Sequence, residues 1–497
     1  MHNFTIQNFR RFARGGFILN NLDQKIKQYF TGESVYKIPS RYSVLSGKTL
    51  PSFIKDWLIK KYTDSNGNLD SESLISFMNE HIPHKKSFIK NRLRTHREEI
   101  TILTRFIVEN DIRNDILKFS IPDLGIKPSE GRIPDYVAKK HKDLKDGEIW
   151  GVISLVYIPP QGKEKGVIEL IKFKPFKPYK VDFAYFKNAR KHFSIEEWID
   201  LLIRSMEYNP DYKDPEKGFD TITKKLLFIT RLLIFLEPNL NLIELAPKGT
   251  GKSYIFGNIS KYNWIFSGGI VSRAKLFFDI GRRISGIIEK YDFVALDEIE
   301  TIKFSNENEL QGALKNYLES GKFTIADYNG VSSAGMMLLG NIQLTSNKQP
   351  VFNNYFKMLP SFFQSSALLD RFHGFLEGWK LVRINEDLII KGYTLNVEYF
   401  SEILHTLRND SNYSYIVGEL INIPQGADTR DKKAIVKLTT AYMKLLFPHV
   451  ESPHDIDKND FYNFCLKPAI EKRQIIRNQL AMMDPEYTES LPVITLK

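Results

Sequence analysis

Apolar residues recur every three or four positions through much of the N-terminal 120 residues, which is the spacing of an amphipathic helix. Two stretches show the pattern, PSFIKDWLIKKY at residues 51–62 and SFIKNRLRTHREEITILTRFIVEN at residues 87–110. Basic residues occupy many of their polar positions. The pattern predicts a mainly helical, basic region over residues 1–120.

The pattern changes between residues 147 and 185. The segments GEIWGVISLVYIP (147–159) and GVIELIKFKPF (166–176) are rich in β-branched and aromatic residues, and a turn containing Pro160 and Gly162 separates them. Such runs on either side of a turn indicate a β-hairpin. We predict a small β-rich subdomain over residues 121–192, for which an OB-like barrel is one open arrangement.

Helices and strands alternate from residue 193 onward. A helix is expected to begin behind Ser194, where Glu197 stands at the capping-box position. The apolar run Leu240–Leu245 predicts a buried strand, and a helix follows from Lys252. This alternation predicts an α/β fold, with a core and its leading helices at 193–384, a helical lid at 385–450 and a short tail at 451–497.

The composition excludes several classes of protein. The longest apolar stretch, Leu226–Phe235, is interrupted by Arg231 and is shorter than the ~20 residues of a membrane helix. The N-terminus lacks the apolar core and cleavage site of a signal peptide. A single cysteine, Cys465, rules out an intrachain disulfide and a cysteine-rich metal site. We expect a cytoplasmic protein with no membrane contact.

Positive charge is unevenly distributed along the chain. The net charge is +11, and residues 1–230 hold 40 Lys and Arg against 29 Asp and Glu, whereas residues 231–497 hold 30 of each kind. A basic region joined to a neutral one indicates a polyanionic partner, most often nucleic acid. An acidic protein partner would produce the same bias.

The segment NLNLIELAPKGTGKSYIFGNI carries the pattern of a phosphate-binding loop, because a strand, a glycine-rich turn and a helix follow in that order. Gly249 and Gly251 let the backbone N–H groups face phosphates, Lys252 supplies charge for the β and γ oxygens, and the Ser253 hydroxyl is expected to bind Mg²⁺. Alanine stands where the pattern has its first glycine. The predicted ATP-binding residues are Ala246, Pro247, Lys248, Gly249, Thr250, Gly251, Lys252 and Ser253.

Two adjacent carboxylates follow the next apolar strand, in YDFVALDEIE. In open α/β sheets, ligands bind at the carboxyl ends of strands, which is where Asp297 and Glu298 are expected. We predict that Asp297 holds Mg²⁺ and that Glu298 activates the attacking water. The alternative is a solvated acidic loop.

Three further polar residues are candidates for catalysis. Asn341 ends the short apolar strand MMLLGNIQ and is expected between Glu298 and the γ-phosphate; its alternative is an ordinary strand-end asparagine. Arg371 stands in LDRF, which resembles the LSRF segment of MCM helicases, whose arginine acts across a subunit interface; its alternative is a surface ion pair. Arg430 begins a late helix, where an AAA+ lid presents a sensor arginine or where a helix start is simply solvated.

Strand, phosphate loop, acid pair, asparagine and the two arginines follow one another in the order of an AAA+ module. An arginine finger acts on the neighbouring subunit, so this order also predicts a ring of identical chains.

Longer stretches resemble the BrxL family of phage-exclusion (BREX) systems. They include NLIELAPKGTGKSYIF, WIFSGG, FVALDEI, NYLESGKFTIAD, LLGNI, LDRFHGFLEGW and, upstream, GEIWGVISLVYI and ARKHFSIEEWIDLLIRS. The resemblance implies an N-terminal DNA-binding region, an AAA+ core related to MCM helicases, a homo-oligomeric ring on double-stranded DNA (hexameric, single or stacked), and defence against phage with other BREX proteins.

One departure from the family concerns proteolysis. Long family members carry a Lon-type Ser–Lys protease domain after the lid. The segment that follows Pro448 is too short for that domain and holds no serine segment of the PxDGPSAG kind. We therefore expect ATP hydrolysis and no protease activity.

Candidate DNA contacts lie in both halves of the chain. Asn329-Gly330 predicts the turn of a hairpin before the Asn341 strand, which would project into the pore of an MCM-like ring or pack on its own domain. The candidates in this half are Lys322, Tyr328, Asn329, Ser272, Arg273 and Lys275. In the N-terminal half they are Arg10, Arg11, Arg14, Lys85, Lys86, Lys90, Arg92, Arg94 and Arg97, interleaved with Phe9, Phe12 and Phe88.

Two other functions compete with a DNA-dependent ATPase. A protein-remodelling ATPase would present an aromatic residue in a pore loop, and the segment after WIFSGG offers Gly268-Gly269-Ile270 without one. A nucleotide-gated scaffold would not require Asp297 and Glu298 together. The basic bias favours DNA as the partner.

Overall fold

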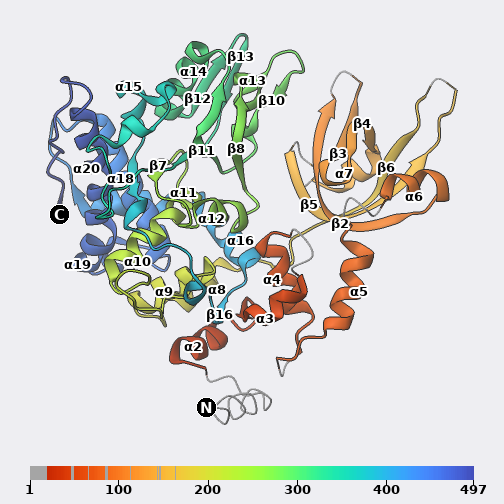
Figure 1. The fold of residues 1–497 in the computed structure, drawn as a ribbon, viewed down its shortest axis with the longest axis horizontal. Helices are drawn as coiled ribbons and strands as arrows, with labels where there is room; N and C mark the ends of the chain where they lie inside the picture. The colour runs from red at the N-terminus through yellow and green to blue at the C-terminus, as the bar shows by residue number, and fades with distance from the viewer. Residues whose placement is uncertain are drawn as a thin grey trace.

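The computed structural model describes residues 19–45, 50–64, 67–83, 88–111, 114–142, 144, 147–162 and 164–497. A barrel of strands β2 to β6 lies to one side of a larger α/β lobe, with helix α4 between them (Figure 1). Within the described residues, no helix combines the length and the apolar character needed to cross a membrane.

A parallel five-stranded sheet forms the centre of the α/β lobe, with strand order β15-β7-β14-β11-β8. The strands are β7 (Asn241–Leu245), β8 (Asn263–Val271), β11 (Phe293–Phe304), β14 (Gly335–Gly340) and β15 (Gly374–Glu377). Every residue of β7 and β14 is buried, because a parallel sheet is covered on both faces. Successive residues face opposite cores: Leu242 belongs to one apolar cluster and Ile243 to the other.

Helices before and after the sheet strands complete this lobe. They are α8 (Phe183–Arg190), α9 (Ile195–Ser205), α10 (Ile222–Ile229), α11 (Leu233–Leu236), α12 (Lys252–Asn258), α14 (Glu307–Ser320), α16 (Val397–Arg408), α17 (Asn412–Leu420), α18 (Thr429–Leu446), α19 (Lys458–Phe461) and α20 (Lys467–Ala481). The predicted capping box of α9 is confirmed, since Ser194 and Glu197 bond each other's backbone N–H.

Residues 451–497, expected as a tail, pack into the same core as residues 385–450. Phe461, Cys465 and Leu466 are fully buried in the apolar cluster that contains α16 and α18. Arg473 of α20 is buried as well, and it donates to Asp431 at 2.7 Å and to Asp370 at 2.5 Å. Helix α20 thereby ties α18 to the segment before β15.

Five strands close the barrel in the order β2-β3-β4-β6-β5. They are β2 (Ile100–Asp111), β3 (Ile116–Ile121), β4 (Ile126–Ile133), β5 (Gly147–Ile158) and β6 (Val167–Pro175). The predicted hairpin is confirmed by the antiparallel pair β5 and β6. The strands β4 and β6 are parallel, and α7 (Asp135–Lys140) follows β4, an arrangement resembling an OB-fold.

The helix predicted through residue 110 is wrong beyond α6 (Ile89–His96), because β2 begins at Ile100. Ile100, Ile102, Phe106 and Val108 all point into the barrel core, at even spacings that suit a strand. The barrel therefore begins well before residue 121.

The first described residues of the chain belong to the α/β lobe. Helix α2 (Asn21–Tyr29) packs into its core, and β1 (Ser34–Lys37) pairs with β16 (Gly392–Leu395). Helices α4 (Ser52–Lys61) and α5 (Ser71–His81) then lead to the barrel. A buried ion pair of Asp23 with Arg204, at 2.8 Å, joins α2 to α9.

Candidate functional site

A glycine-rich loop, residues 246–251, joins the carboxyl end of β7 to α12. Gly249 and Gly251 have φ angles of 86° and 76°, in the left-handed region that favours glycine. At Gly251 a side chain would also collide with its surroundings, because a Cβ there would stand 1.9 Å from the Tyr208 hydroxyl. The turn predicted from the sequence therefore needs glycine for both backbone conformation and space.

Lys252 lies at the mouth of this loop and is 7% exposed. Its Nζ donates to Asn341 Oδ1 at 3.1 Å and to the Ala246 carbonyl at 3.4 Å. The Ala246 N–H in turn donates to the Gly340 carbonyl at 3.1 Å, which joins the loop to the end of β14. The structure thus brings together the predicted lysine and the predicted asparagine.

A buried ion pair between Arg231 and Glu244, which was not predicted, binds the glycine-rich loop on the side of the core. The guanidinium of Arg231 binds Glu244 of β7 through two hydrogen bonds, of 2.9 and 2.5 Å, and both side chains are fully buried. Arg231 also donates to the Thr250 carbonyl at 2.9 Å. A buried pair is stable only when such bonds satisfy its remaining donors and acceptors. Arg231 and Glu244 each stand alone inside an apolar stretch of the sequence, and this could have suggested a buried ion pair.

The acid pair lies on β11, at the carboxyl edge of the sheet. Asp297 is 3% exposed, and its Oδ1 accepts from the Glu298 N–H at 2.9 Å. Glu298 is exposed and has a φ of 49°, a conformation that residues other than glycine rarely adopt. Strained residues of this kind persist where the surrounding structure holds them, often at functional sites.

A third carboxylate, Glu300, belongs to the same group. The Asn341 Nδ2 donates to Glu300 Oε1, so Asn341 links Lys252 on one side to Glu300 on the other. Glu298 and Glu300 are two positions apart on a strand, and both are exposed. The alternation in DEIE could have suggested Glu300 as a site residue.

The oxygen atoms present suit Mg²⁺ held together with a nucleotide. Mg²⁺ usually takes one or two protein ligands and fills its other positions with phosphate oxygens and water. The Ser253 hydroxyl in the first turn of α12 and the Asp297 carboxylate are ligands of this kind. Among the described residues there is no cluster of three or more His, Cys, Asp or Glu that would hold a metal without a nucleotide.

Arg371 and Arg430 lie together, away from this chain's own glycine-rich loop. Arg371 precedes β15, which runs parallel to β7 with Gly374 opposite Leu242, so it lies at the amino edge of the sheet. The five residues of β7 separate that edge from the loop by about 16 Å. The Nε atoms of Arg371 and Arg430 are 3.2 and 3.0 Å from Glu319 Oε2.

The two arginines differ in their electrostatic surroundings. Burial, and then the charge of Arg430, lower the pKa of Arg371. Burial has the same effect on Arg430, but its hydrogen bonds to Asp370 and Glu319 outweigh burial and raise its pKa. Arg371 is therefore the less well compensated of the two cations, although both stay charged.

The hairpin predicted before β14 is present, but its turn is not at Asn329-Gly330. Strands β12 (Lys322–Ile325) and β13 (Tyr328–Val331) meet around residues 326–327, and Asn329 lies within β13 and accepts from Thr324 Oγ1 at 2.8 Å. Gly330 faces the Phe323 ring, which occupies the space of a Cβ. Glycine is needed at this position because the Phe323 ring leaves no space for a side chain, and not because the chain turns there.

Most of the other residues proposed to contact DNA in this half make contacts within the chain. Tyr328 stacks on Phe278 at 3.8 Å and its hydroxyl donates to Glu289 at 2.9 Å, whereas Lys322 is exposed. Ser272 caps α13 (Arg273–Leu276). Arg273 pairs with Glu309 at 2.7 Å, and the Lys275 ammonium lies 4.5 Å from the centre of the Phe266 ring.

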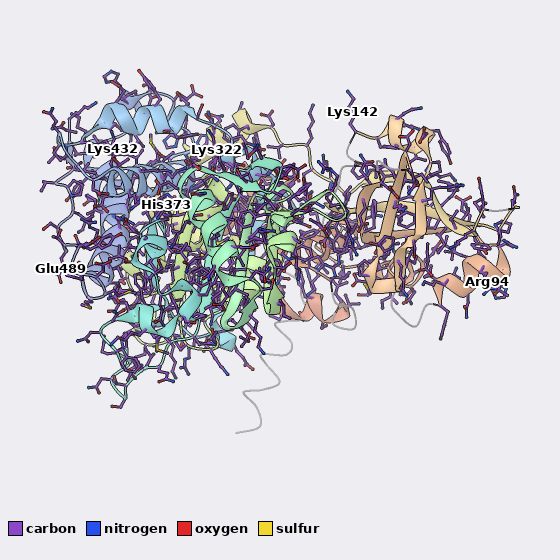
Figure 2. The ribbon with its side chains drawn as sticks, turned by 90° about the horizontal axis from the view of Figure 1, so that it is seen from above. Arg94, Lys142, Lys322, His373, Lys432 and Glu489 are labelled. Atoms are coloured by element: carbon purple, nitrogen blue, oxygen red, sulfur yellow. The ribbon has the colours of Figure 1, made fainter. Side chains whose placement is uncertain are left out.

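Two of the candidate basic residues beside the barrel are paired with carboxylates. Lys90 binds Glu130 and Arg92 binds Glu98, each at 2.7 Å, and Arg97 lies 5.0 Å from the centre of the Tyr157 ring. Arg94 lies at the outer end of the barrel lobe (Figure 2). Phe88, at the start of α6, is 68% exposed. Arg10, Arg11, Arg14, Lys85, Lys86, Phe9 and Phe12 lie outside the described residues.

Two models of one protein family match most of the chain. Residues 168–492 match the family model described as Lon-like protease BrxL-like, ATPase domain, and residues 28–157 match the model of the BREX system Lon protease-like protein BrxL N-terminal region. Two curated relatives are each named Lon-like protease BrxL. The protein of Escherichia coli O9:H4 (strain HS) is 27% identical over 467 residues and that of Bacillus cereus (strain H3081.97) is 26% identical over 471. The matches cover 93% of this chain but 65% and 67% of those relatives.

Proposed function

The chain belongs to the BrxL family and carries a BrxL-type ATPase domain, and from this we propose that it is a ring-forming AAA+ ATPase that couples ATP binding and hydrolysis to clamping or moving along double-stranded DNA. The proposed role is anti-phage defence together with other BREX proteins. The N-terminal match bears the BREX name, which supports this setting.

The observation that carries the ATPase proposal is the group of side chains at the carboxyl edge of the sheet. Lys252, Asn341 and Glu300 form one hydrogen-bonded chain there, and β11 places Asp297 and Glu298 at the same edge. Ligands of open α/β sheets bind at this edge. A cation, an acid pair and a polar amide around a phosphate loop are the groups that phosphoryl transfer to water needs.

The residues then divide the reaction among them. Lys252 leaves Asn341 Oδ1 to bind the β and γ oxygens, and the loop N–H groups and the start of α12 face the phosphates. Ser253 and Asp297 would hold Mg²⁺, which would supply positive charge against the charge that develops on the transferring phosphoryl group. Glu298 accepts a proton from the attacking water, while Asn341 orients that water or the γ-phosphate.

The position of Arg371 supports the proposal of a ring. Its side chain lies at the other edge of the sheet from the glycine-rich loop, so it does not serve its own loop in this arrangement. An arginine supplied by a neighbouring subunit would stabilise the transition-state charge at that neighbour's site. Arg430 shares Glu319 with Arg371, so we propose that both face the same neighbouring nucleotide.

The barrel supports the proposal of DNA as the partner. Barrels of the OB type bind oligonucleotides on one strand face and through the loops that flank it. Helix α6 lies against β5, with Arg97 over Tyr157 near the end of that strand, and it carries Arg94. Phosphate contacts from such residues would bind DNA without reading its sequence.

The test is the ATPase rate with and without duplex DNA, measured on the parent and two variants. Lys252→Ala should abolish nucleotide binding, because it removes the cation that lies inside the loop. Glu298→Gln should bind ATP yet hydrolyse it at least about a hundredfold more slowly. Hydrolysis by Glu298→Gln at the parent rate would refute the assigned base, and a DNA-independent parent rate with no DNA binding would refute the partner.

A further inference from the structure

A mostly buried cluster of charged and hydroxyl side chains, with the 40% exposed Tyr254 at its edge, lies between helix α12 and the segment from β1 to α4. Glu207 is at its centre. The Glu207 Oε1 accepts from Lys37 Nζ at 2.5 Å, and Oε2 accepts from Ser52 Oγ at 2.7 Å and from the Tyr254 hydroxyl. Lys37 also binds Asp56 at 3.0 Å. The cluster therefore joins β1, α4, the end of α9 and α12.

On its nucleotide side, the cluster contacts the phosphate-binding elements directly. Tyr254 follows Ser253 in the first turn of α12. Tyr208 follows Glu207, and its hydroxyl occupies the space beside Gly251 where a Cβ would stand. Glu207 has a φ of 72°, a conformation that is held only where the surroundings determine it. Two neighbouring residues thus contact both the loop and its helix.

On the other side, α4 connects the cluster to the barrel. Ser52 and Asp56 are on this helix and are 1% and 0% exposed. The same helix packs its rings on the barrel and on the segment just after it. Phe53 meets Trp150 of β5 edge to face at 5.6 Å, and Trp57 meets Phe176 at 5.2 Å. A continuous chain of contacts therefore runs from Tyr254, the residue after Ser253, through Glu207 and α4 to β5.

The hydroxyl groups of Ser52 and Tyr254 help to stabilise the negative charge of the cluster. Two carboxylates share one ammonium, so the buried group carries excess negative charge. Burial opposes ionisation of Glu207, but Lys37 and the hydrogen bonds of Lys37, Tyr254 and Ser52 hold its pKa below the usual value. Losing one donor leaves buried charge less well solvated, and packed regions respond to such changes by switching arrangement rather than by bending gradually.

We infer that Tyr254 and Glu207 are positioning residues that transmit nucleotide occupancy from α12 to the barrel through α4. The inference rests on the proposed binding of ATP at the glycine-rich loop. Bound phosphates would attract the N–H groups in the first turn of α12 and shift Tyr254. A shift of Tyr254 would change its hydrogen bond to Glu207, and through Glu207 the bonds to Ser52 and Lys37. Coupling of this kind is reciprocal, so DNA on the barrel would also alter nucleotide affinity.

Hydrogen exchange of the α4 amides in the full chain tests the inference, with and without Mg²⁺ and a non-hydrolysable ATP analogue. In the parent, the analogue should slow exchange of residues 52–61 by about tenfold, the effect expected when a hydrogen bond to a buried charge is strengthened. Tyr254→Phe should still bind a fluorescent form of the analogue, but its α4 exchange should no longer respond. Glu207→Gln should lose the response in the same way.

Tyr262→Phe is the matched control, because it also removes a tyrosine hydroxyl bound to a carboxylate, that of Glu402 at 2.6 Å, in the same lobe. Its α4 response should equal that of the parent. An α4 response in Tyr254→Phe as large as in the parent would overturn the inference. So would a parent that binds the analogue without any change in α4. A parent that fails to bind the analogue would instead refute the proposed function, and the inference with it.

Discussion

Arg371 and Arg430 share one carboxylate, with their Nε atoms 3.2 and 3.0 Å from Glu319 Oε2. Arg430 has a second acidic partner in Asp370 at 2.9 Å, whereas Arg371 also donates to the Ala367 carbonyl. Arg371 would therefore leave Glu319 for an approaching phosphate at a smaller cost in free energy than Arg430 would. Glu319 lies at the end of α14, which links this arginine pair to the hairpin that follows that helix.

Arg371→Ala subunits should bind ATP normally and fail to hydrolyse it. The charge on the transferring phosphoryl group would lose its stabiliser, which costs about a thousandfold or more in rate. Mixing them with Lys252→Ala subunits creates interfaces that pair an intact loop from one subunit with an intact Arg371 from the other. ATP turnover should then return in part. Mixed rings that stay as inactive as either variant alone would place Arg371 in a role within its own subunit.

Asn341→Ala should slow hydrolysis while leaving nucleotide binding largely intact. Asn341 connects Lys252 to Glu300 at the mouth of the loop, so its loss would misplace groups needed in the transition state more than those needed for binding. Loss of one such preorganised polar group costs on the order of a hundredfold. Turnover and fluorescent-nucleotide binding measure the two effects, with the exposed Asn459→Ala as control. A rate unchanged by Asn341→Ala would make Asn341 an ordinary strand-end residue.

Arg94→Gln should weaken binding to duplex DNA and reduce the salt dependence of that binding. Each phosphate contact releases counterions, so loss of one contact lowers the slope of log affinity against log salt by about 0.9. The matched control is Lys432→Gln, since Lys432 lies on the opposite side of the molecule from Arg94 (Figure 2). Equal losses in the two variants would show that only net charge, and not a surface on the barrel lobe, attracts the DNA.

His449 should make the protein sensitive to mild acid. Burial, with the charges of Arg190 and Lys191, lowers its pKa to about 4, whereas the unfolded chain titrates near 6.5. Between these values the unfolded state binds more protons, so the free energy of unfolding falls as pH drops from about 6.5 toward 4. Urea unfolding at several pH values should show a shallower fall in His449→Gln. The exposed His454→Gln should keep the parent's slope, and an equal slope in His449→Gln would contradict the prediction.

Features set by neighbouring residues were predictable from the sequence. The glycine-rich turn between β7 and α12, the acid pair at the carboxyl edge and the capping box of α9 each depend on residues a few positions apart. The β5–β6 hairpin was predictable for the same reason. The β2 strand was mistaken for a helix because its first residues continue the apolar spacing of α6, although its alternating buried residues suit a strand.

Pairings between distant segments were decided by the tertiary structure alone. The order β15-β7-β14-β11-β8 places Asn341 beside Lys252 and Glu300, and it separates Arg371 from its own loop. Many of the basic residues of the N-terminal half proved to be paired with carboxylates, which a count of charges does not show. The preference of a segment for a turn, a helix start or a strand depends on a few neighbouring residues, so it can be inferred from the sequence. Which strands become neighbours, and which charges meet, depends on how apolar faces pack across the whole chain.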